Sequence, residues 1–448
     1  MWCFKQVVKA AVTLSIIFGT NAWAGAHGGA PTQTVITNVN IFNGVDDKLA
    51  TGQSVLIEGN LIRQVGPGLS ADGAEVIDGG GRTLMPGLID MHSHLALQEG
   101  LYEGRDNWDQ MAMGAMTAHV LLDYLDQGFT TAMDLGGNML GMAKAVNEGR
   151  IPGPRIYPSG GFLTQTGGHA DMGVFSDGID TVNDLERHGF GYIADGVPEV
   201  QEAARYNFAR GATQVKIMGG GGVSSAFDPI HTTQYSPEEM KAIVEVAKDY
   251  GTFATVHAYH DRSVNRALDA GVRVIQHAFL VSEKTVKRMA KEGVALDLQA
   301  VMSVAVFAEP EKITFFTADQ KAKATQVHNG SKQMIKWALE HNVLIATGGD
   351  MFGRDLVGQQ AANITILTDL GFTPLQALRT ATSNATEVLT WSGEMNPYKY
   401  GTLGTIAEGG YADIILVDGN PVLDLKALER DRVHFVMKDG IVYKNKLD

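Results

Sequence analysis

The sequence predicts an α/β fold in which a (β/α)8 barrel is inserted into a small β domain. Apolar strand-like runs alternate with helical patterns through the middle of the chain, and short runs of alternating apolar and polar residues mark strands at both ends. The length of 448 residues exceeds the roughly 250 to 300 residues that one hydrophobic core usually organises. We therefore expect two structural units.

The first 24 residues have the composition of a secretory signal peptide. Lys5 and Lys9 give a basic start, residues 10–19 are mostly apolar, and an Ala-Trp-Ala motif ends at Ala24. The apolar run is too short to span a membrane, and no later stretch reaches the roughly 18 apolar residues that a spanning helix needs. We expect an exported protein, periplasmic or secreted, that is cleaved near Ala24 and has no membrane span.

Charge and cysteine content limit the partners and the metal ligands that the protein can have. The formal net charge is -14, which argues against nucleic acid as a partner. Cys3 is the only cysteine and lies in the signal peptide, so the mature chain would have no disulfide and no thiolate ligand. Any metal must therefore be bound by histidine, carboxylate or modified lysine.

Both ends of the chain carry short strands of the alternating kind. Neither end has enough strands to complete a sheet alone, so we expect residues 25–83 and 393–448 to share one β-sandwich domain. The barrel would then occupy residues 84–392. The strand candidates of the β domain are 33–41, 53–65, 412–418, 433–438 and 441–443.

The segment 84–392 alternates strands with helices, which is typical of parallel βα units. It has eight strand candidates, the number that closes a TIM barrel. The strand candidates are 84–90, 129–135, 155–159, 213–218, 252–258, 272–279, 294–299 and 343–347. The clearest helical patterns are 237–250, 262–270, 283–292, 320–341 and 374–389.

The run from Thr83 to His94 is the most informative stretch, because it is an apolar strand that ends in His92 and His94. Successive side chains of a strand point to opposite faces, so these two histidines share a face and can bind one metal ion. Two ordinary polar residues at a strand end are the alternative interpretation. Pro86 and Gly87 lie where the chain would pass from the β domain into the barrel.

Four later strand ends carry side chains of the kind that bind metals. Lys216 lies within an apolar strand, where an unpaired ammonium is disfavoured; its functional interpretation is a carbamate formed with carbon dioxide, which can bridge two cations. His257 and His277 each follow an apolar run, and Asp350 follows two glycines. Each of these residues, considered alone, has an ordinary alternative. The lysine could be paired with an acidic residue, the histidines could belong to the core, and the aspartate could lie in a turn. Catalytic groups of such barrels lie at the carboxyl ends of strands, and coincidence at five strand ends is improbable.

The charges of such a site suit hydrolysis. Two divalent cations bring +4, and a carbamate, an aspartate and a bridging hydroxide remove three charges, which leaves +1 to stabilise a developing oxyanion. Asp350 would take the proton of the attacking water and pass it to the leaving nitrogen.

This combination of residues resembles the binuclear metal-dependent amidohydrolase superfamily over nearly all of the mature chain. The resemblance implies a distorted (β/α)8 TIM barrel with a β-sandwich domain, and usually zinc, although manganese, iron and cobalt stay open. By position, His92, His94 and Asp350 would bind the first metal, His257 and His277 the second, and carboxylated Lys216 both. The residues that carry the resemblance are 86–94, Lys216, His257, His277, Asp350 and the tail 401–424.

The loops are similar to those of a narrower group, the dipeptidases and carboxypeptidases that cut Xaa-Pro or Xaa-Arg/Lys bonds, with ochratoxin-hydrolysing relatives. The matching loop segments are 165–171, 228–235 and 257–260. Within them, His169 could hydrogen-bond the scissile carbonyl, and Tyr259, His231 or the nearby Arg262 could hold a free carboxylate; each has an ordinary alternative as a loop-ordering residue. Relatives often form symmetric oligomers, so we expect a homo-oligomer.

A run of four glycines, Gly219–Gly222, follows the strand that carries Lys216. It lacks the Lys-Ser/Thr that completes a phosphate-binding loop, and its spacing does not match a dinucleotide motif. We interpret it as a flexible loop at the mouth of the barrel.

The sequence therefore predicts a hydrolase that cleaves an amide bond next to a carboxylate, in dipeptides, N-acyl amino acids or ochratoxin-like amides. The rival enzyme class is a deaminase or an imidazolonepropionase-like hydrolase of cyclic amides with a single metal. Such relatives keep the His-x-His motif, a later histidine and the aspartate but lack the bridging lysine. A non-catalytic scaffold is the third alternative, and the filled ligand positions argue against it.

Overall fold

The computed structural model describes residues 32–98, 109–225, 227–353, 356 and 358–447. The predicted signal peptide lies outside the described residues. Among the helices within these ranges, none combines the length and apolarity needed to cross a membrane.

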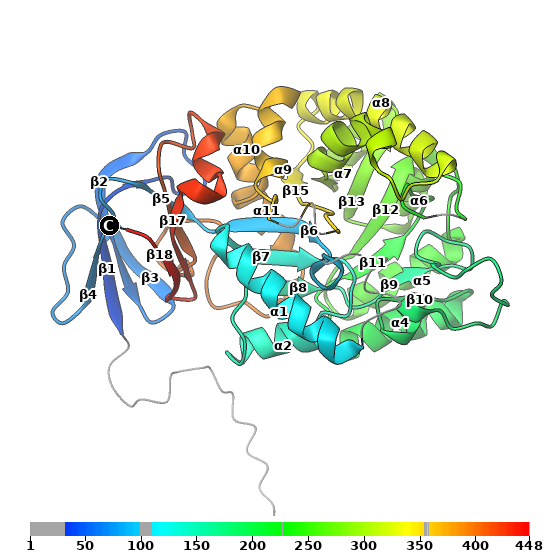
Figure 1. Ribbon diagram of the computed structural model, residues 1–448, viewed down its shortest axis with the longest axis horizontal. Helices are drawn as coiled ribbons and strands as arrows, with labels where there is room; N and C mark the ends of the chain where they lie inside the picture. The colour runs from blue at the N-terminus through cyan, green and yellow to red at the C-terminus, as the bar shows by residue number, and fades with distance from the viewer. Residues whose placement is uncertain (1–31, 99–108, 226, 354–355, 357, 448) are drawn as a thin grey trace, which may run out of the picture. The chain divides into compact units, whose positions relative to one another are not determined.

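The two ends of the chain share one mixed sheet (Figure 1). In the described residues its strands follow the order β18-β17-β16-β5-β1-β2-β3, with β4 paired to β1. N-terminal β5 thus lies beside C-terminal β16, and Ile36, Leu84 and Phe435 are buried in its core. The strands are β1 (Gln33–Ile41), β2 (Ala50–Glu58), β3 (Leu61–Gly66), β4 (Glu75–Asp78), β5 (Thr83–Pro86), β16 (Ile414–Val417), β17 (Val433–Lys438) and β18 (Ile441–Asn445).

The strand predicted over 84–90 is divided between two sheets. β5 pairs antiparallel with β16, whereas the next strand, β6 (Leu88–Ser93), pairs parallel with β7. Gly87 lies between them, donates its amide hydrogen to the carbonyl of Asp413 at 2.9 Å, and has no room for a side chain because a Cβ would lie 2.1 Å from Thr130 Oγ1. The glycine thus lets the chain pass from one sheet to the other at this crowded point.

The middle of the chain forms two parallel sheets within the described ranges, with orders β6-β7-β8 and β10-β9-β11-β12-β13-β14-β15. The backbone connects them at both edges, because Thr213 N donates to Pro158 O at 2.8 Å and Asp350 N donates to His92 O at 2.7 Å. This arrangement is consistent with a TIM barrel. The strands after β6 are β7 (Phe129–Asp134), β8 (Arg155–Pro158), β9 (Phe162–Thr164), β10 (Gly191–Ile193), β11 (Val215–Met218), β12 (Ala254–His260), β13 (Val274–Leu280), β14 (Ala295–Leu298) and β15 (Ile345–Thr347).

Helices connect these strands and pack against them, as α2 does against β8, α6 against β12 and α8 against β13 (Figure 1). The α-helices are α1 (Gln110–Asp126), α2 (Leu140–Asn147), α3 (Asp184–Arg187), α4 (Val197–Ala209), α5 (Pro237–Asp249), α6 (Asp261–Ala270), α7 (Glu283–Glu292), α8 (Ala318–Glu340), α9 (Ala362–Thr365), α10 (Pro374–Thr380) and α11 (Ser383–Thr390). Shorter helical turns include η1 (Leu95–Leu97), η2 (Val301–Ala305), η3 (Val306–Ala308), η4 (Pro310–Lys312), η6 (Ile366–Leu370), η7 (Gly393–Met395), η8 (Leu425–Leu428) and η9 (Arg430–Arg432).

The helix predicted over 374–389 is two helices, α10 and α11. The interruption falls at Ala381, whose carbonyl accepts a hydrogen bond from the amide of Ile89 in β6 at 2.9 Å. Thr382 adopts φ -135° and ψ -101°, which is outside the helical region. The helix therefore breaks where its backbone bonds to the strand that leads to His92 and His94.

Candidate metal centre

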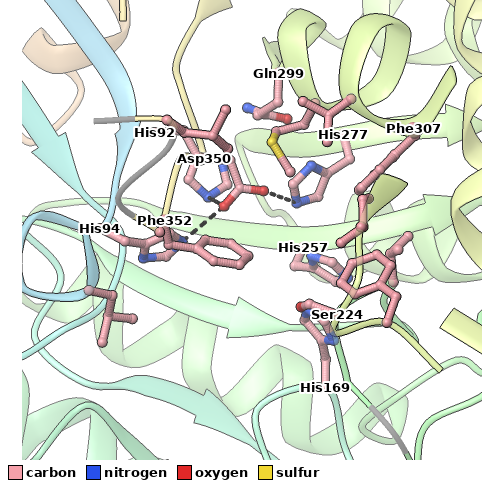
Figure 2. Close-up of a pocket in the computed structure, with 18 of the residues that line it drawn as sticks. His92, His94, His169, Ser224, His257, His277, Gln299, Phe307, Asp350 and Phe352 are labelled. Carbon is pink, nitrogen blue, oxygen red and sulfur yellow. Dashed lines mark ion pairs between the residues drawn. The ribbon is translucent and has the colours of Figure 1, made fainter. Parts of the chain in front are cut away.

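The carboxyl ends of β6, β11, β12, β13 and β15 open into one cavity of about 700 Å³ (Figure 2). The cavity is lined by all six side chains that the sequence predicts as metal ligands. These residues are His92, His94, Lys216, His257, His277 and Asp350.

The tightest group in the cavity consists of His92, His94 and Asp350. Nε2 of His92 lies 3.4 Å and Nε2 of His94 lies 3.2 Å from Oδ1 of Asp350. One ligand atom from each of the three residues lies within 4.8 Å of the others, which is the spacing of groups that could share one ion. The pair of histidines on β6 and the aspartate after β15 are thus close enough to bind one metal.

Hydrogen bonds behind these ligands fix their places. The buried carboxylate of Asp90 accepts the amide hydrogens of His92 at 3.0 Å and Gly349 at 2.9 Å, and the hydroxyl of Tyr124 at 2.9 Å. Because Gly349 directly precedes Asp350, one carboxylate holds the first and last strands of the site in register. Such supporting bonds orient metal ligands in proteins.

His94 has its own backbone support. Its Nδ1 lies 3.1 Å from the carbonyl oxygen of Gly136, so Nε2 is left to face Asp350. Asp134, at the end of β7, accepts the amide hydrogen of Leu95 at 2.8 Å, and burial raises the pKa of its carboxyl to about 7.

The second group consists of His257 on β12 and His277 on β13, whose ring centroids are 4.6 Å apart. Nε2 of His277 lies 4.0 Å from Oδ2 of Asp350, on the side opposite the first group (Figure 2). Burial lowers the pKa of His277 to about 3 and that of His257 well below its usual value, so both rings are neutral, the form that binds metal. The backbone at His277 and Asp350 adopts positive φ values of 73° and 48°, a strain often found at functional sites.

Lys216 lies on β11 and is almost completely buried, with 1% of its surface exposed. Burial lowers its pKa to about 8, although Asp350 and Asp297 act in the opposite direction. Burial alone would raise the pKa of Asp350, but His92, His94 and His277 outweigh that effect and hold it below its usual range. Asp350 is therefore a carboxylate at neutral pH.

The donor set fits divalent metal ions. Four imidazoles and one carboxylate face a common space, and the ring atom His92 Nδ1 is buried without a hydrogen-bond partner in the described part of the chain. Imidazole and carboxylate are ligands of zinc and of several other first-row divalent ions. The residues are therefore suited to bind a divalent metal ion, but their types do not select one metal among these.

The four predicted substrate-binding residues occupy two different environments. His169 and Tyr259 line the cavity, and Tyr259 stacks on the ring of His277 with centroids 5.0 Å apart. His231 and Arg262 are exposed and are not among the residues that line it.

Sequence reasoning missed two features of the cavity. One is an aromatic wall contributed in part by the segment after β14, whose phenylalanines are not residues of the metal-binding kind. The other is a group of loop residues behind His169, namely Gly222, Ser225 and Asp228. The aromatic wall consists of Phe162, Phe279, Phe307, Phe315, Phe316 and Phe352.

Comparisons with known proteins agree with this geometry. Residues 83–442 match the model of the Amidohydrolase family. An ochratoxinase of Aspergillus niger is 30% identical over 379 residues, which cover 81% of this chain and 75% of that protein.

Two solved structures extend the comparison. A prolidase complexed with N-methylphosphonate-L-proline has a TM-score of 0.84 at 32% identity, covering 92% of this chain and 100% of the other. A Xaa-Pro dipeptidase with methionine bound in its active site has a TM-score of 0.82 at 28% identity, with the same coverage. From the match over most of its length, this chain belongs to the amidohydrolase family.

Proposed function

We propose that this protein is a metal-dependent hydrolase of an amide bond next to a carboxylate, in dipeptides, N-acyl amino acids or ochratoxin-like amides. The observation that carries the proposal is the convergence of four histidines, Lys216 and Asp350 in one cavity. Similarity to an ochratoxinase and to a prolidase supports the choice of bond.

The ligands divide into two groups on either side of Asp350 (Figure 2). His92, His94 and Asp350 would hold the first metal, and His257 and His277 would hold the second. Lys216, as a carbamate formed with carbon dioxide, would be a ligand of both, and zinc is the metal that we expect.

The chemistry of the bound metals is to lower the pKa of a water molecule and to polarise the scissile carbonyl. Asp350 takes the proton from the attacking water, because its depressed pKa keeps it ionised at neutral pH. It then delivers that proton to the leaving nitrogen as the amide C–N bond breaks. His169, whose ring stacks on that of His257, hydrogen-bonds the scissile carbonyl.

The cavity favours a substrate with a bulky apolar group. Its aromatic wall includes Phe307, Phe316 and Phe352, which give that side of the cavity an apolar lining. Of the residues predicted to hold the carboxylate, Tyr259 lines the cavity, so we assign the contact to Tyr259. An aromatic N-acyl amino acid or an ochratoxin-like amide fits these surroundings.

We also retain three proposals that rest on the sequence and the family resemblance. The parallel strands close as a distorted (β/α)8 barrel beside a β-sandwich domain. The protein is exported after cleavage near Ala24. It assembles as a homo-oligomer.

A single-metal deaminase or imidazolonepropionase-like enzyme is the second candidate. The observation in its favour is that His92, His94 and Asp350 form the only tight cluster of histidine and acidic side chains in the described residues. Such an enzyme has no need of Lys216.

A hydrolysis screen with zinc and bicarbonate present tests the proposed function. The substrates are Xaa-Pro, Xaa-Arg and Xaa-Phe dipeptides and N-acyl amino acids, with the Asp350→Asn variant as the matched control. We expect the wild type to release free amino acid and the variant to lose activity by at least about 100-fold. Protein loaded with two zinc equivalents that turns over none of these substrates would refute the proposal.

A further inference from the structure

His169 is held in a specific place within the cavity. Its ring stacks on that of His257, with centroids 4.1 Å apart and an angle of 16° between the ring planes (Figure 2). The other contacts of the ring come from the loop that follows β11.

Gly222 lies directly against the ring of His169. A Cβ atom at this position would lie 1.9 Å from Cε1 and 2.5 Å from Nε2 of the histidine, far inside contact distance. The glycine run that includes it is buried, whereas we expected a flexible loop at the mouth. Gly221 is packed as closely, because a Cβ there would lie 2.1 Å from the carbonyl oxygen of Pro229. Gly222 therefore leaves the space that the imidazole occupies, and Gly221 allows the loop backbone to pack against Pro229.

Asp228 and Ser225 hold the other ring nitrogen of His169. Nδ1 lies 2.7 Å from Oγ of Ser225 and 3.3 Å from Oδ2 of Asp228, whose side chain has no exposed surface. Oδ2 also accepts the amide hydrogen of Gly222 at 2.8 Å. One carboxylate thus fixes both the imidazole and the glycine beneath it, and Nε2 is the ring nitrogen left to meet the substrate.

The loop itself is anchored from helix α8. Nζ of Lys323, a buried side chain, donates to the carbonyl oxygens of Ser225 at 3.1 Å and Asp228 at 2.9 Å. Nε2 of Gln320 donates to the carbonyl oxygen of Ser224 at 2.6 Å. Burying a charged lysine is costly unless its hydrogens are paired, and here the ammonium is paired with two backbone carbonyls of this loop and with Asp319 at 3.2 Å.

We propose that Asp228 and Gly222 are positioning residues for catalysis, which hold the imidazole of His169 where it hydrogen-bonds the scissile amide. The inference rests on the proposed function, since it assumes that His169 contacts the substrate. Asp228 does not touch the substrate and acts through His169. Partners that orient a functional histidine typically contribute about 10- to 100-fold to activity.

A double-mutant cycle separates this role from a merely structural one. His169→Asn should lower kcat by about 100-fold with a smaller change in KM, because the contact strengthens as the carbonyl reacts. Asp228→Asn should lower kcat about tenfold or more. The double variant should equal His169→Asn alone, because Asp228 has no route to the substrate once the imidazole is gone.

Gly222→Ala supplies a second, independent test, since it leaves both polar side chains in place. The new methyl group should displace the imidazole, so kcat should fall toward that of His169→Asn, and the two changes together should cause no further loss. Asp195→Asn is the matched control: Asp195 accepts from the amide of Thr166 at 3.2 Å on the loop before His169, but it does not line the cavity. It should keep wild-type kcat.

Metal content and thermal unfolding are measured for every variant, and two metal equivalents should remain in each. If the kcat losses caused by Asp228→Asn and by His169→Asn multiply in the double variant, the inference is overturned and the proposed function stays intact. Unchanged kcat in Asp228→Asn or in Gly222→Ala would also overturn the inference and leave the proposed function intact. A wild-type protein that loads two zinc ions and hydrolyses no amide would overturn the proposed function and the inference together.

Discussion

Nε2 of His94 lies 3.2 Å from Oδ1 of Asp350, although the two residues lie at the carboxyl ends of the first and last parallel strands. The amide of Asp350 also donates to the carbonyl oxygen of His92 at 2.7 Å. The candidate metal centre is therefore built across the contact between β6 and β15, and its geometry depends on that contact.

Lys216→Ala tests the bridge between the two metals. Without the carbamate, His257 and His277 alone should not retain the second ion, so metal content should fall from two equivalents to about one and activity should be abolished. Metal analysis and the hydrolysis assay check both. A fully active variant would favour the single-metal alternative.

Removal of metal should destabilise the fold as well as abolish activity. An ion that binds only the folded state stabilises it by about 2.7 kcal/mol at 100 times its Kd. We expect chelation to lower Tm and zinc with bicarbonate to restore both Tm and activity. The His92→Ala variant is the control, because its Tm should respond much less to zinc.

Asp90→Ala tests the carboxylate that joins the ends of the site. It would leave the amides of His92 and Gly349 and the hydroxyl of Tyr124 without their acceptor, and each buried unsatisfied group costs about 1–3 kcal/mol. We expect a fall of at least that size in the free energy of unfolding, measured in denaturant, together with weaker metal binding. Tyr124→Phe removes only one of these bonds and should have a smaller effect on both; an equal effect would contradict the assignment.

The Arg155→Met variant tests how much the ion pairs between the β domain and the parallel sheets stabilise the protein. The buried guanidinium of Arg155 lies 2.8 Å from Asp413 and 2.6 Å from Asp439, beneath the ring of Tyr411. Arg155→Met would leave the buried carboxylate of Asp413 and the partly buried carboxylate of Asp439 without their cation and should destabilise the protein by about 3–5 kcal/mol. Arg150→Met is the matched control, since the ion pair of Arg150 with Glu148 is exposed and should contribute less than about 1 kcal/mol.

Phe307→Ala tests the aromatic wall. The variant should lower kcat/KM for an aromatic N-acyl amino acid by about tenfold, because a buried aromatic contact is worth on the order of 1–2 kcal/mol. The value for the N-acetyl analogue should change little, because an acetyl group does not reach the wall. A uniform loss for both substrates would show that Phe307 supports the fold and not specificity.

The side chains that line the candidate metal centre could be predicted because each depends on local sequence. Alternation along a strand places His92 and His94 on one face, Lys216 lies within an apolar strand, and His257 and His277 each follow an apolar run. Pro86 and Gly87 mark the point of passage between the sheets, but the pairing of β5 with β16 could not be predicted, since β16 comes from the other end of the chain. The strand predicted at 155–159 also continues, after a break, as β9, which joins the other parallel sheet.

The contacts behind His169 depend entirely on tertiary structure. Asp228 reaches Nδ1 of the histidine only because the loop is folded back under Lys323, and no local pattern indicates that pairing. The exposure of His231 and Arg262 also depends on tertiary structure. The sequence after β11 and at the start of α6 does not show which side chains will face the cavity.

The two-metal hydrolytic site is tested most directly by hydrolytic activity measured against zinc equivalents added to metal-free protein in bicarbonate, with a substrate from the screen. We expect activity to rise until two equivalents are bound per chain. Full activity at one equivalent, or none at two, would contradict this expectation.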